Sequence, residues 1–97
     1  MVVKVLDHVA QCYTEADGTV IRALLHDALA RGGKVVVSFQ GVSDVPSSFV
    51  NAALISLLDD FSFDYIRKHL AVTDSTRQIN DMILRRFRFV TEQPQAA

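Results

Sequence analysis

The stretch KVVVSFQGVSDVPSSFVNAAL, residues 34–54, does most to decide the fold. Three consecutive valines in 34–39 show no alternation of apolar and polar side chains. Such a run is typical of a strand covered on both faces in a partly parallel sheet. Residues 48–58 have the length of a helix and are apolar almost all round, apart from Asn51 and Ser56. The stretch therefore predicts an inner strand followed by a buried helix.

Two further elements are predicted before this stretch. Residues 2–6 are short and rich in β-branched side chains, which indicates a first strand. A single apolar stripe over residues 21–29 then predicts a helix. Either Asp17 or Thr19 can cap its start, and Gly32-Gly33 can end it, because glycine adopts the left-handed conformation without steric cost. The stripe consists of Ile21, Leu24, Leu25, Ala28 and Leu29.

The remainder of the chain predicts a third strand and a third main helix. Residues 61–68 show no clear pattern. Residues 69–73 predict a strand, and an apolar stripe from Ile79 to Phe87 predicts a helix. Ser75 and Gln78 have the spacing of a capping box at the start of that helix. Residues 88–90 either extend the helix or form a last edge strand. The predicted fold class is α/β, a mixed sheet of about four strands with three main helices.

Length and composition narrow the class of protein. The 97 residues suit one domain, predicted over 1–91, with a short flexible tail over 92–97. Ten basic against eleven acidic residues argue against a general nucleic-acid or acidic-membrane binder. A single cysteine, Cys12, favours a reducing compartment. No run could span a bilayer and the N-terminus does not resemble a signal peptide, so a cytoplasmic location is expected.

The adjacent serines Ser47 and Ser48 are the main candidate site, because they lie after a strand and at a helix start. In open α/β sheets ligands tend to sit at that edge. One interpretation is structural: a serine hydroxyl caps the helix, with the Asn51 amide as partner of Ser48. The other is regulatory, since a phosphoserine would bring nearly two negative charges to this surface. Asp44 fits either a turn or a docking site, and a buried Asn51 would need a polar partner.

Other classes of site are not supported by the spacing of reactive residues. Cys12 has no Cys-x-x-Cys partner, and His8 and His26 form no His-x-x-x-His pair, so neither a metal site nor a catalytic thiol is expected. The basic-aromatic run 85–89 resembles single-strand nucleic-acid sites. It equally suits arginines at a helix C-terminus with phenylalanines as core anchors. No glycine-rich phosphate loop follows a strand, and no cofactor is predicted.

The motifs GGKVVVSFQGV, VPSSFVNAALISLL and LAVTD, within residues 12–87, carry a family resemblance. They resemble the small bacterial STAS-like family of unknown function and, more distantly, the STAS domains of anti-sigma-factor antagonists. The resemblance implies a non-enzymatic regulatory or protein-interaction module. It also implies phosphorylation of a serine at the start of the second main helix by an ATP-binding serine kinase or signalling ATPase. Ser48, with Ser47 beside it, occupies the matching place.

The partner-binding residues expected on this interpretation are Asp44, Val45, Pro46 and Asn51. The alternative is a structural or assembly subunit, a homo-oligomer whose serines only cap the helix. A homodimer or a docked partner is also expected along the helix that begins at Ser48 or along the last helix, because the helix from Ser48 carries more apolar surface than one sheet contact needs.

Overall fold

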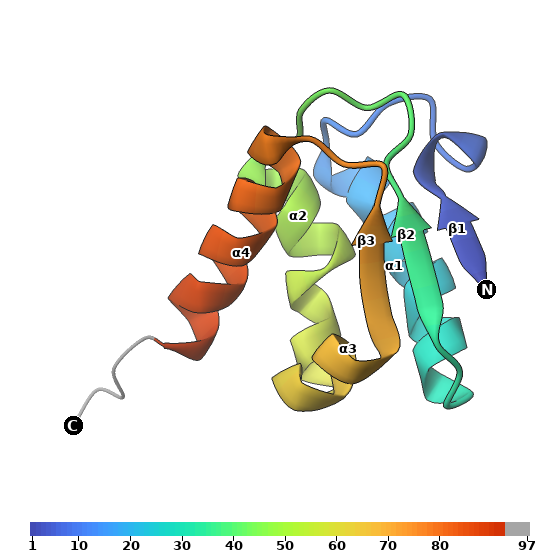
Figure 1. Cartoon of the computed structure of the whole chain (residues 1–97), viewed down its shortest axis with the longest axis vertical. Coiled ribbons are helices and arrows are strands. Elements are labelled where there is room, and N and C mark those ends of the chain that lie inside the picture. Colours follow the sequence, from blue (N-terminus) through green and yellow to red (C-terminus); the bar gives the residue numbers. More distant parts are fainter. Residues whose placement is uncertain (93–97) are drawn as a thin grey trace.

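The computed structural model describes residues 1–92; the predicted tail over 92–97 lies outside the described residues apart from Glu92. The described residues form one α/β unit, with three strands and four α-helices joined by short 3-10 turns (Figure 1). The strands are β1 (Val2–Lys4), β2 (Val35–Ser38) and β3 (Leu70–Thr73). The helices are α1 (Glu15–Ala30), α2 (Ser47–Ala53), α3 (Phe63–His69) and α4 (Arg77–Thr91). The 3-10 turns are η1 (Val5–Asp7) and η2 (Ile55–Asp59).

The sheet is wholly parallel, with the strand order β1-β2-β3. The predicted α/β class is confirmed, but the prediction of about four strands in a mixed sheet differs from the three parallel strands observed. Residues 88–90 continue α4 instead of forming an edge strand. The undecided segment 61–68 contributes the additional helix α3, which begins where Ser62 Oγ accepts the amide of Tyr65.

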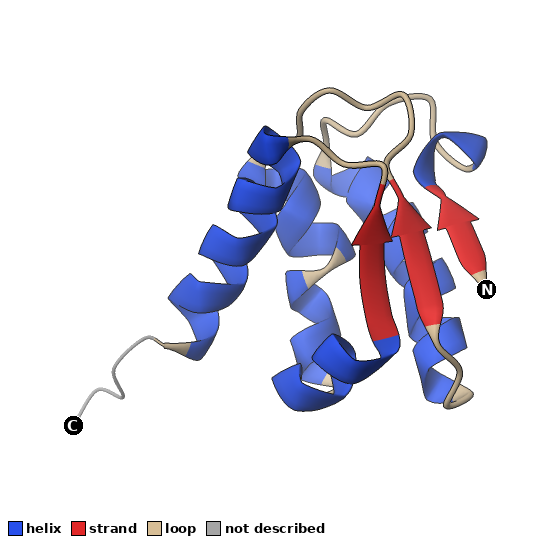
Figure 2. Cartoon of the chain, in the orientation of Figure 1, coloured by secondary structure: helices blue, strands red, loops and turns tan. Residues whose placement is uncertain are grey.

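The triple-valine strand β2 lies at the centre of the sheet, as predicted, but only one of its faces is covered. Val35 and Val37 are fully buried, whereas Val36 is half-buried. Figures 1 and 2 show α1 and α2 behind the strands and no element in front of them. Each step from β1 to β2 to β3 moves in the same direction, so right-handed crossovers place both connecting helices on the same face. The prediction of two covered faces was therefore wrong.

The uncovered face of the sheet carries a row of apolar side chains in register. Val2 pairs with Val36, and Val36 pairs with Ala71. Val2 is 67% exposed, and Ala71 is also exposed. The next row on this face is polar and consists of Lys4, Ser38 and Thr73. A parallel sheet normally has both faces buried, so this open face is unusual.

The core lies between the sheet and the helices. Its largest fully buried side chains are Phe39, Phe49, Ile21, Leu25, Leu29, Leu54, Leu57 and Ile79. In α2 the apolar residues Phe49, Val50 and Ala53 are all buried within the chain. The helix has α1 on one side and α4 on another, and Ala52 is its one apolar residue that is half-buried instead of buried. The expectation of a homodimer through this helix loses that basis.

Helix α1 begins earlier than its apolar stripe suggested. Thr14 is the N-cap, with its Oγ1 accepting the Asp17 amide at 3.1 Å while the Asp17 carboxylate accepts the Thr14 amide at 3.2 Å. Asp17 thus takes part in a capping box from inside the helix, and Thr19 is not the cap. The predicted end at Gly32-Gly33 is confirmed. Gly32 has a φ of 78°, and the two glycine amides donate to the carbonyls of Leu29 and Ala28.

Helices α1 and α2 approach each other closely at Gly18. A methyl group at this position would lie 2.7 Å from both Ala52 Cβ and the carbonyl oxygen of Phe49. Because one of these neighbours is backbone, the contact cannot relax by a simple rotation of a side chain. The absence of a side chain at Gly18 therefore sets the distance between the two helices.

We expect Gly18→Ala to lower the free energy of unfolding, measured by urea denaturation, by up to about 2 kcal/mol. Overpacking costs about 1–3 kcal/mol, and the gain of about 1 kcal/mol in helix propensity offsets only part of that cost. Gly33→Ala is the matched control, because the nearest atom to its added methyl group would be 3.7 Å away. Equal stability of Gly18→Ala and the native chain would contradict a tight helix contact.

Candidate functional site

The loop between β2 and α2, residues 39–46, is the candidate site, and the start of α4 holds it in place. Thr76 Oγ1 donates to the Ser43 carbonyl at 2.8 Å. The Gln78 side chain bonds both backbone groups of Val45: its Oε1 accepts the amide at 2.9 Å and its Nε2 donates to the carbonyl at 3.0 Å. A side-chain amide here completes backbone pairing in the way that a neighbouring strand would.

This role of Gln78 explains why the predicted capping box at Ser75 is wrong. Thr76 caps α4, with its Oγ1 accepting the Ile79 amide at 3.3 Å. The Gln78 side chain, which a box would direct back to its own helix start, instead reaches the loop between β2 and α2. A local sequence pattern could not reveal this partner, because it lies 33 residues away in the chain.

The ends of β2 and β3 are joined beneath the loop. Ser38 is buried, and its Oγ donates to the Asp74 carboxylate at 2.7 Å and accepts the Gln40 amide at 3.3 Å. Asp74 has a φ of 54°, a left-handed conformation that is uncommon for residues other than glycine. These contacts fix the carboxyl edge of the sheet, where the loops emerge.

Neither serine of the pair caps α2. The helix begins at Ser47, its N-cap is Pro46, and no side chain makes a capping hydrogen bond. The capping interpretation, including a bond from Ser48 to the Asn51 amide, was therefore wrong. Pro46 occupies the N-cap position and has no side-chain acceptor, so the first turn of α2 receives no side-chain cap. Both serines are exposed, and within residues 1–92 the Ser48 hydroxyl makes no hydrogen bond to another side chain or to the backbone.

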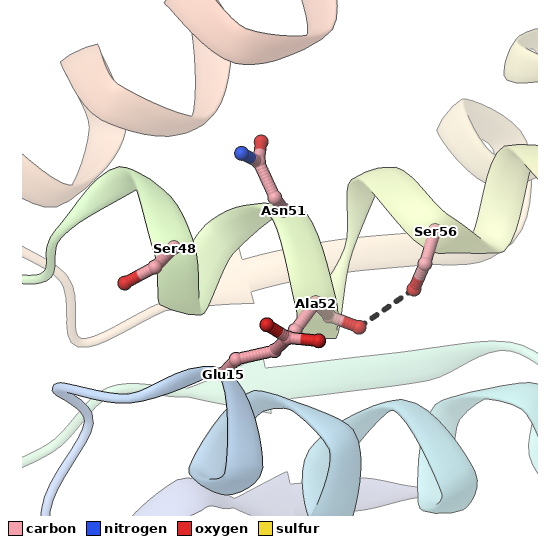
Figure 3. A pocket seen from close by; sticks show the side chains of 5 residues that line it. All are labelled: Glu15, Ser48, Asn51, Ala52 and Ser56. Carbon is pink, nitrogen blue, oxygen red and sulfur yellow. Dashed lines mark hydrogen bonds between the residues drawn. The ribbon is translucent and has the colours of Figure 1, made fainter.

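Ser48 lines a groove of about 410 Å³ between the start of α1 and α2 (Figure 3). The other lining residues are Glu15, Asn51, Ala52 and Ser56. Ser56 Oγ donates to the Ala52 carbonyl at 2.6 Å and is thereby satisfied by its own helix. The groove thus combines a free hydroxyl, a carboxylate and an amide.

Asn51 has the polar partner that its position required. Its Oδ1 accepts Nε of Arg86 from α4 at 2.9 Å, and the Arg86 guanidinium lies 5.0 Å from the centre of the Phe89 ring. In Figure 3 Asn51 leaves α2 in a different direction from Ser48. This hydrogen bond ties α2 to α4, so Asn51 has a structural role whatever else it contacts.

The other predicted partner-binding residues divide between surface and core. Asp44 is exposed, and its carboxylate makes no hydrogen bond within the described part of the chain. Pro46 is half-buried. Val45 is only 2% exposed and anchors the loop in the core, so its side chain offers little surface to a partner. Sequence reasoning missed two residues: the fold brings Tyr13, from the segment before α1, to this loop, and Glu15, the first residue of α1, to the start of α2.

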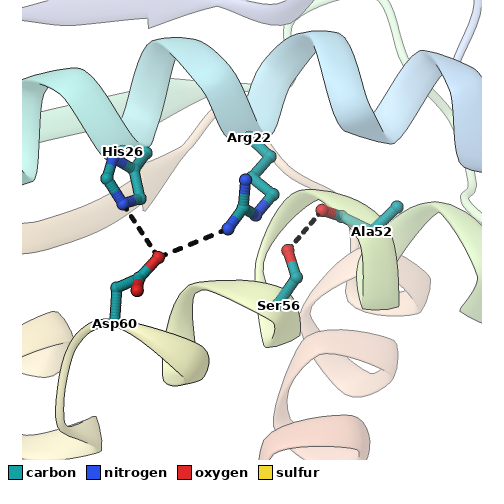
Figure 4. Close-up of polar contacts among 5 residues, drawn as sticks. All are labelled: Arg22, His26, Ala52, Ser56 and Asp60. Atoms are coloured by element: carbon teal, nitrogen blue, oxygen red, sulfur yellow. Dashed lines mark hydrogen bonds and ion pairs between the residues drawn. The ribbon is translucent and has the colours of Figure 1, made fainter.

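Beyond the groove, Asp60 links α1 to the end of η2 (Figure 4). Its carboxylate lies 2.9 Å from His26 Nε2 and 3.4 Å from Arg22 Nη2. All three side chains are between one third and one half exposed, so the pairs contribute modestly to stability. They add a second connection between α1 and the segment after α2, besides the packing at Gly18.

Cys12 lies at the same edge but is not a reactive thiol. The residue is 2% exposed, and burial raises the pKa of its thiol to about 11, with the charge of Asp17 adding to the effect. The thiol is therefore protonated at neutral pH. Within residues 1–92 no group of three or more potential ligands could hold a metal ion.

We expect the native protein to react very slowly with iodoacetamide at pH 8. A pKa of about 11 instead of 9.0 lowers the thiolate fraction about a hundredfold, and burial limits access further. The same protein unfolded in urea is the control and should react like free cysteine. Rapid alkylation of the native protein, followed by mass spectrometry, would contradict a sealed thiol.

The fold places the chain in the class of small parallel α/β proteins, with structured loops at the carboxyl edge of the sheet. Comparison with protein-family models then identifies its family. Residues 17–80, about two thirds of it, match the model of the STAS-like domain of unknown function (DUF4325), and the chain belongs to this family. The match runs from the first turn of α1 to the first turn of α4 and includes Ser48.

No curated protein and no solved structure matches the chain. No helix among the described residues has the length and apolar character to cross a membrane.

Proposed function

We propose that this domain is a non-enzymatic protein-interaction module that is switched by phosphorylation of Ser48. The observation that carries the proposal is the free, exposed hydroxyl of Ser48 at the start of a helix that does not use it as a cap. A hydroxyl needed for capping would be occupied by the backbone. This one is reachable by the active site of another protein.

The physical effect of modification would be a change in surface charge. A phosphoserine carries between one and a half and two negative charges at neutral pH. Ser48 shares its groove with the carboxylate of Glu15, and Asp44 lies four residues before it in the loop. The phosphate would therefore make an already acidic surface more acidic. A partner with an acidic surface would be repelled, and one with arginines would bind more tightly.

The proposed partner is an ATP-binding serine kinase or signalling ATPase in the cytoplasm. Membership of a STAS-like family supports this choice, through the resemblance to anti-sigma-factor antagonists. The structured loop over 39–46 supports a docking role, because a rigid surface loses less conformational entropy on binding.

Substitution of Ser48 tests the switch. We expect Ser48→Ala and Ser48→Asp to change the free energy of unfolding by less than about 0.5 kcal/mol, because the hydroxyl makes no bond that is lost. We expect the two variants to bind the physiological partner with opposite changes in affinity, measured by isothermal titration calorimetry. Ser47→Ala and Ser47→Asp are the matched controls on the neighbouring exposed serine.

Mass spectrometry of the protein isolated from its own cells provides the second arm of that test. Phosphate at Ser48 is the expected finding. Unmodified Ser48 under every growth condition, with partner affinity equal for the alanine and aspartate variants, would overturn the switch.

The alternative function is assembly through a second copy of this chain. The open sheet face favours it, because its row of Val2, Val36 and Ala71 is apolar and Lys4 is the only charged side chain in the two rows described. A second copy placed on this face would bury the apolar row with little charge to desolvate.

Sedimentation velocity tests this alternative. If the face forms a dimer, Ala71→Lys should yield a monomer with an unchanged circular dichroism spectrum, since it places a charge in the interface while the side chain stays exposed in the free chain. Val20→Lys is the control, because Val20 is 44% exposed on α1, behind the sheet. A native chain that stays monomeric at high concentration would exclude the dimer.

A further inference from the structure

The exposed side chain of Tyr13 lies beside two hollows at the carboxyl edge of the sheet. The residue is 54% exposed although it lies in the segment that leads into α1. One hollow, of about 100 Å³, lies toward Leu6, Gly41 and Val42. The other, of about 370 Å³, is formed with Asp44, Val45 and Pro46. Tyr13 is the residue that lines both hollows.

The walls of these hollows are fixed before any ligand arrives. Gln78 and Thr76 hold the backbone of residues 43–45, and the Val42 amide donates to the Phe39 carbonyl at 2.9 Å. On the other side, the capping box of Thr14 and Asp17 fixes the residue next to Tyr13, and the Tyr13 amide itself donates to the Asp17 carboxylate at 3.3 Å. An exposed aromatic ring on a rigid support is typical of a binding hot spot.

Carboxylates outnumber basic side chains in the chain segments around Tyr13. Residues 5–21 and 35–66 contain no lysine and no arginine. The carboxylates of Asp7, Glu15, Asp17, Asp44 and Asp74 all follow the carboxyl ends of the strands or open the next helix. Asp17 and Asp74 are bonded within the fold, whereas the carboxylates of Asp44 and Glu15 make no hydrogen bond or ion pair within residues 1–92. The basic residues that border these two ranges are Lys4, Arg22, Lys34 and Arg67, and Arg77 lies in the first turn of α4.

We propose that this surface, defined by Leu6, Tyr13, Gly41, Val42, Asp44 and Pro46, docks an extended basic segment of a partner protein. Apolar side chains of that segment occupy the hollows beside Tyr13, and an arginine or lysine pairs with Asp44. The Tyr13 ring provides a flat contact for aliphatic groups and for a guanidinium. Charge complementarity selects a basic partner and repels an acidic one.

The proposed docking surface depends on the proposed interaction function, and it specifies that the partner presents a basic segment. Tyr13 is two residues from Glu15, and Pro46 is two residues from Ser48, so the docking surface and the Ser48 groove draw on the same two chain segments. A phosphate at Ser48 would add negative charge near a surface that already attracts cations. Phosphorylation therefore strengthens the binding of the basic segment and does not block it.

Titration of the full chain with three short synthetic peptides tests the docking surface. The first alternates arginine with leucine and proline; the second replaces each arginine by glutamate; the third replaces leucine and proline by glycine and serine. We expect only the first to shift the NMR signals of Tyr13 and residues 41–46, with an affinity that falls as salt is raised. The third peptide separates apolar recognition from charge attraction alone.

Variants locate the binding. Tyr13→Ala and Asp44→Lys should each weaken the first peptide about tenfold or more, as expected for a hot-spot residue and a reversed charge. Phe89→Ala is the matched control, because Phe89 is 55% exposed on α4 and away from this edge. Ser48→Asp should bind the first peptide at least as tightly as the native chain.

The outcomes separate this proposal from the Ser48 switch. If no peptide shifts the signals of residues 6–13 and 41–46, or if the glutamate peptide binds as well as the arginine peptide, the docking surface is wrong. The Ser48 substitutions would then stand as an independent test. If the arginine peptide binds at Tyr13 while the Ser48 variants bind the partner like the native chain, the surface stands and the switch fails.

Discussion

The close contact between α1 and α2 at Gly18 is the constraint on which the rest of the structure depends. Because Gly18 has no side chain, the backbone of α2 at Phe49 and the side chain of Ala52 approach α1 directly. This approach lets both helices pack on the same face of a sheet of only three strands. It also brings Glu15 and Ser48, from segments far apart in the sequence, to one groove. The packing of the core and the geometry of the candidate site therefore share one cause.

Contacts from the start of α4 fix the conformation of the loop that carries the candidate site. Gln78 takes the place of a strand partner for Val45, and Thr76 holds Ser43 while capping α4. The start of α4 thus fixes the conformation of the loop that precedes α2. Because both backbone groups of Val45 are satisfied, the loop can remain at the surface and still be rigid. Rigidity of this kind suits a surface that recognises another protein.

Two features of the surface follow from topology and from the distribution of charge. The strand order β1-β2-β3 leaves one sheet face without a helix, because both right-handed crossovers fall on the other face. The carboxyl edge of the sheet collects acidic side chains, whereas Arg31 and Lys34 lie in the turn that enters β2 and Arg85, Arg86 and Arg88 lie on α4. A chain with a net charge of −1 can therefore carry a local excess of acidic side chains at one edge, even with Lys4 and Arg77 beside it. The overall composition does not reveal this local excess of acidic side chains.

The sequence by itself determined the α/β class, the central position of β2, the glycine end of α1 and the place of the serine pair, because these depend on local periodicity, chain order and backbone freedom. It determined neither which face of the sheet stays open nor which residue caps a helix. Crossover handedness decided the first, and competition from distant partners decided the second. Gln78 looked like part of a capping box but bonds Val45, and Ser48 looked like a cap but lies inside α2, after Pro46 at the N-cap position. Tyr13 gave no local signal, because only the tertiary structure brings it to the hollows beside Gly41 and Pro46.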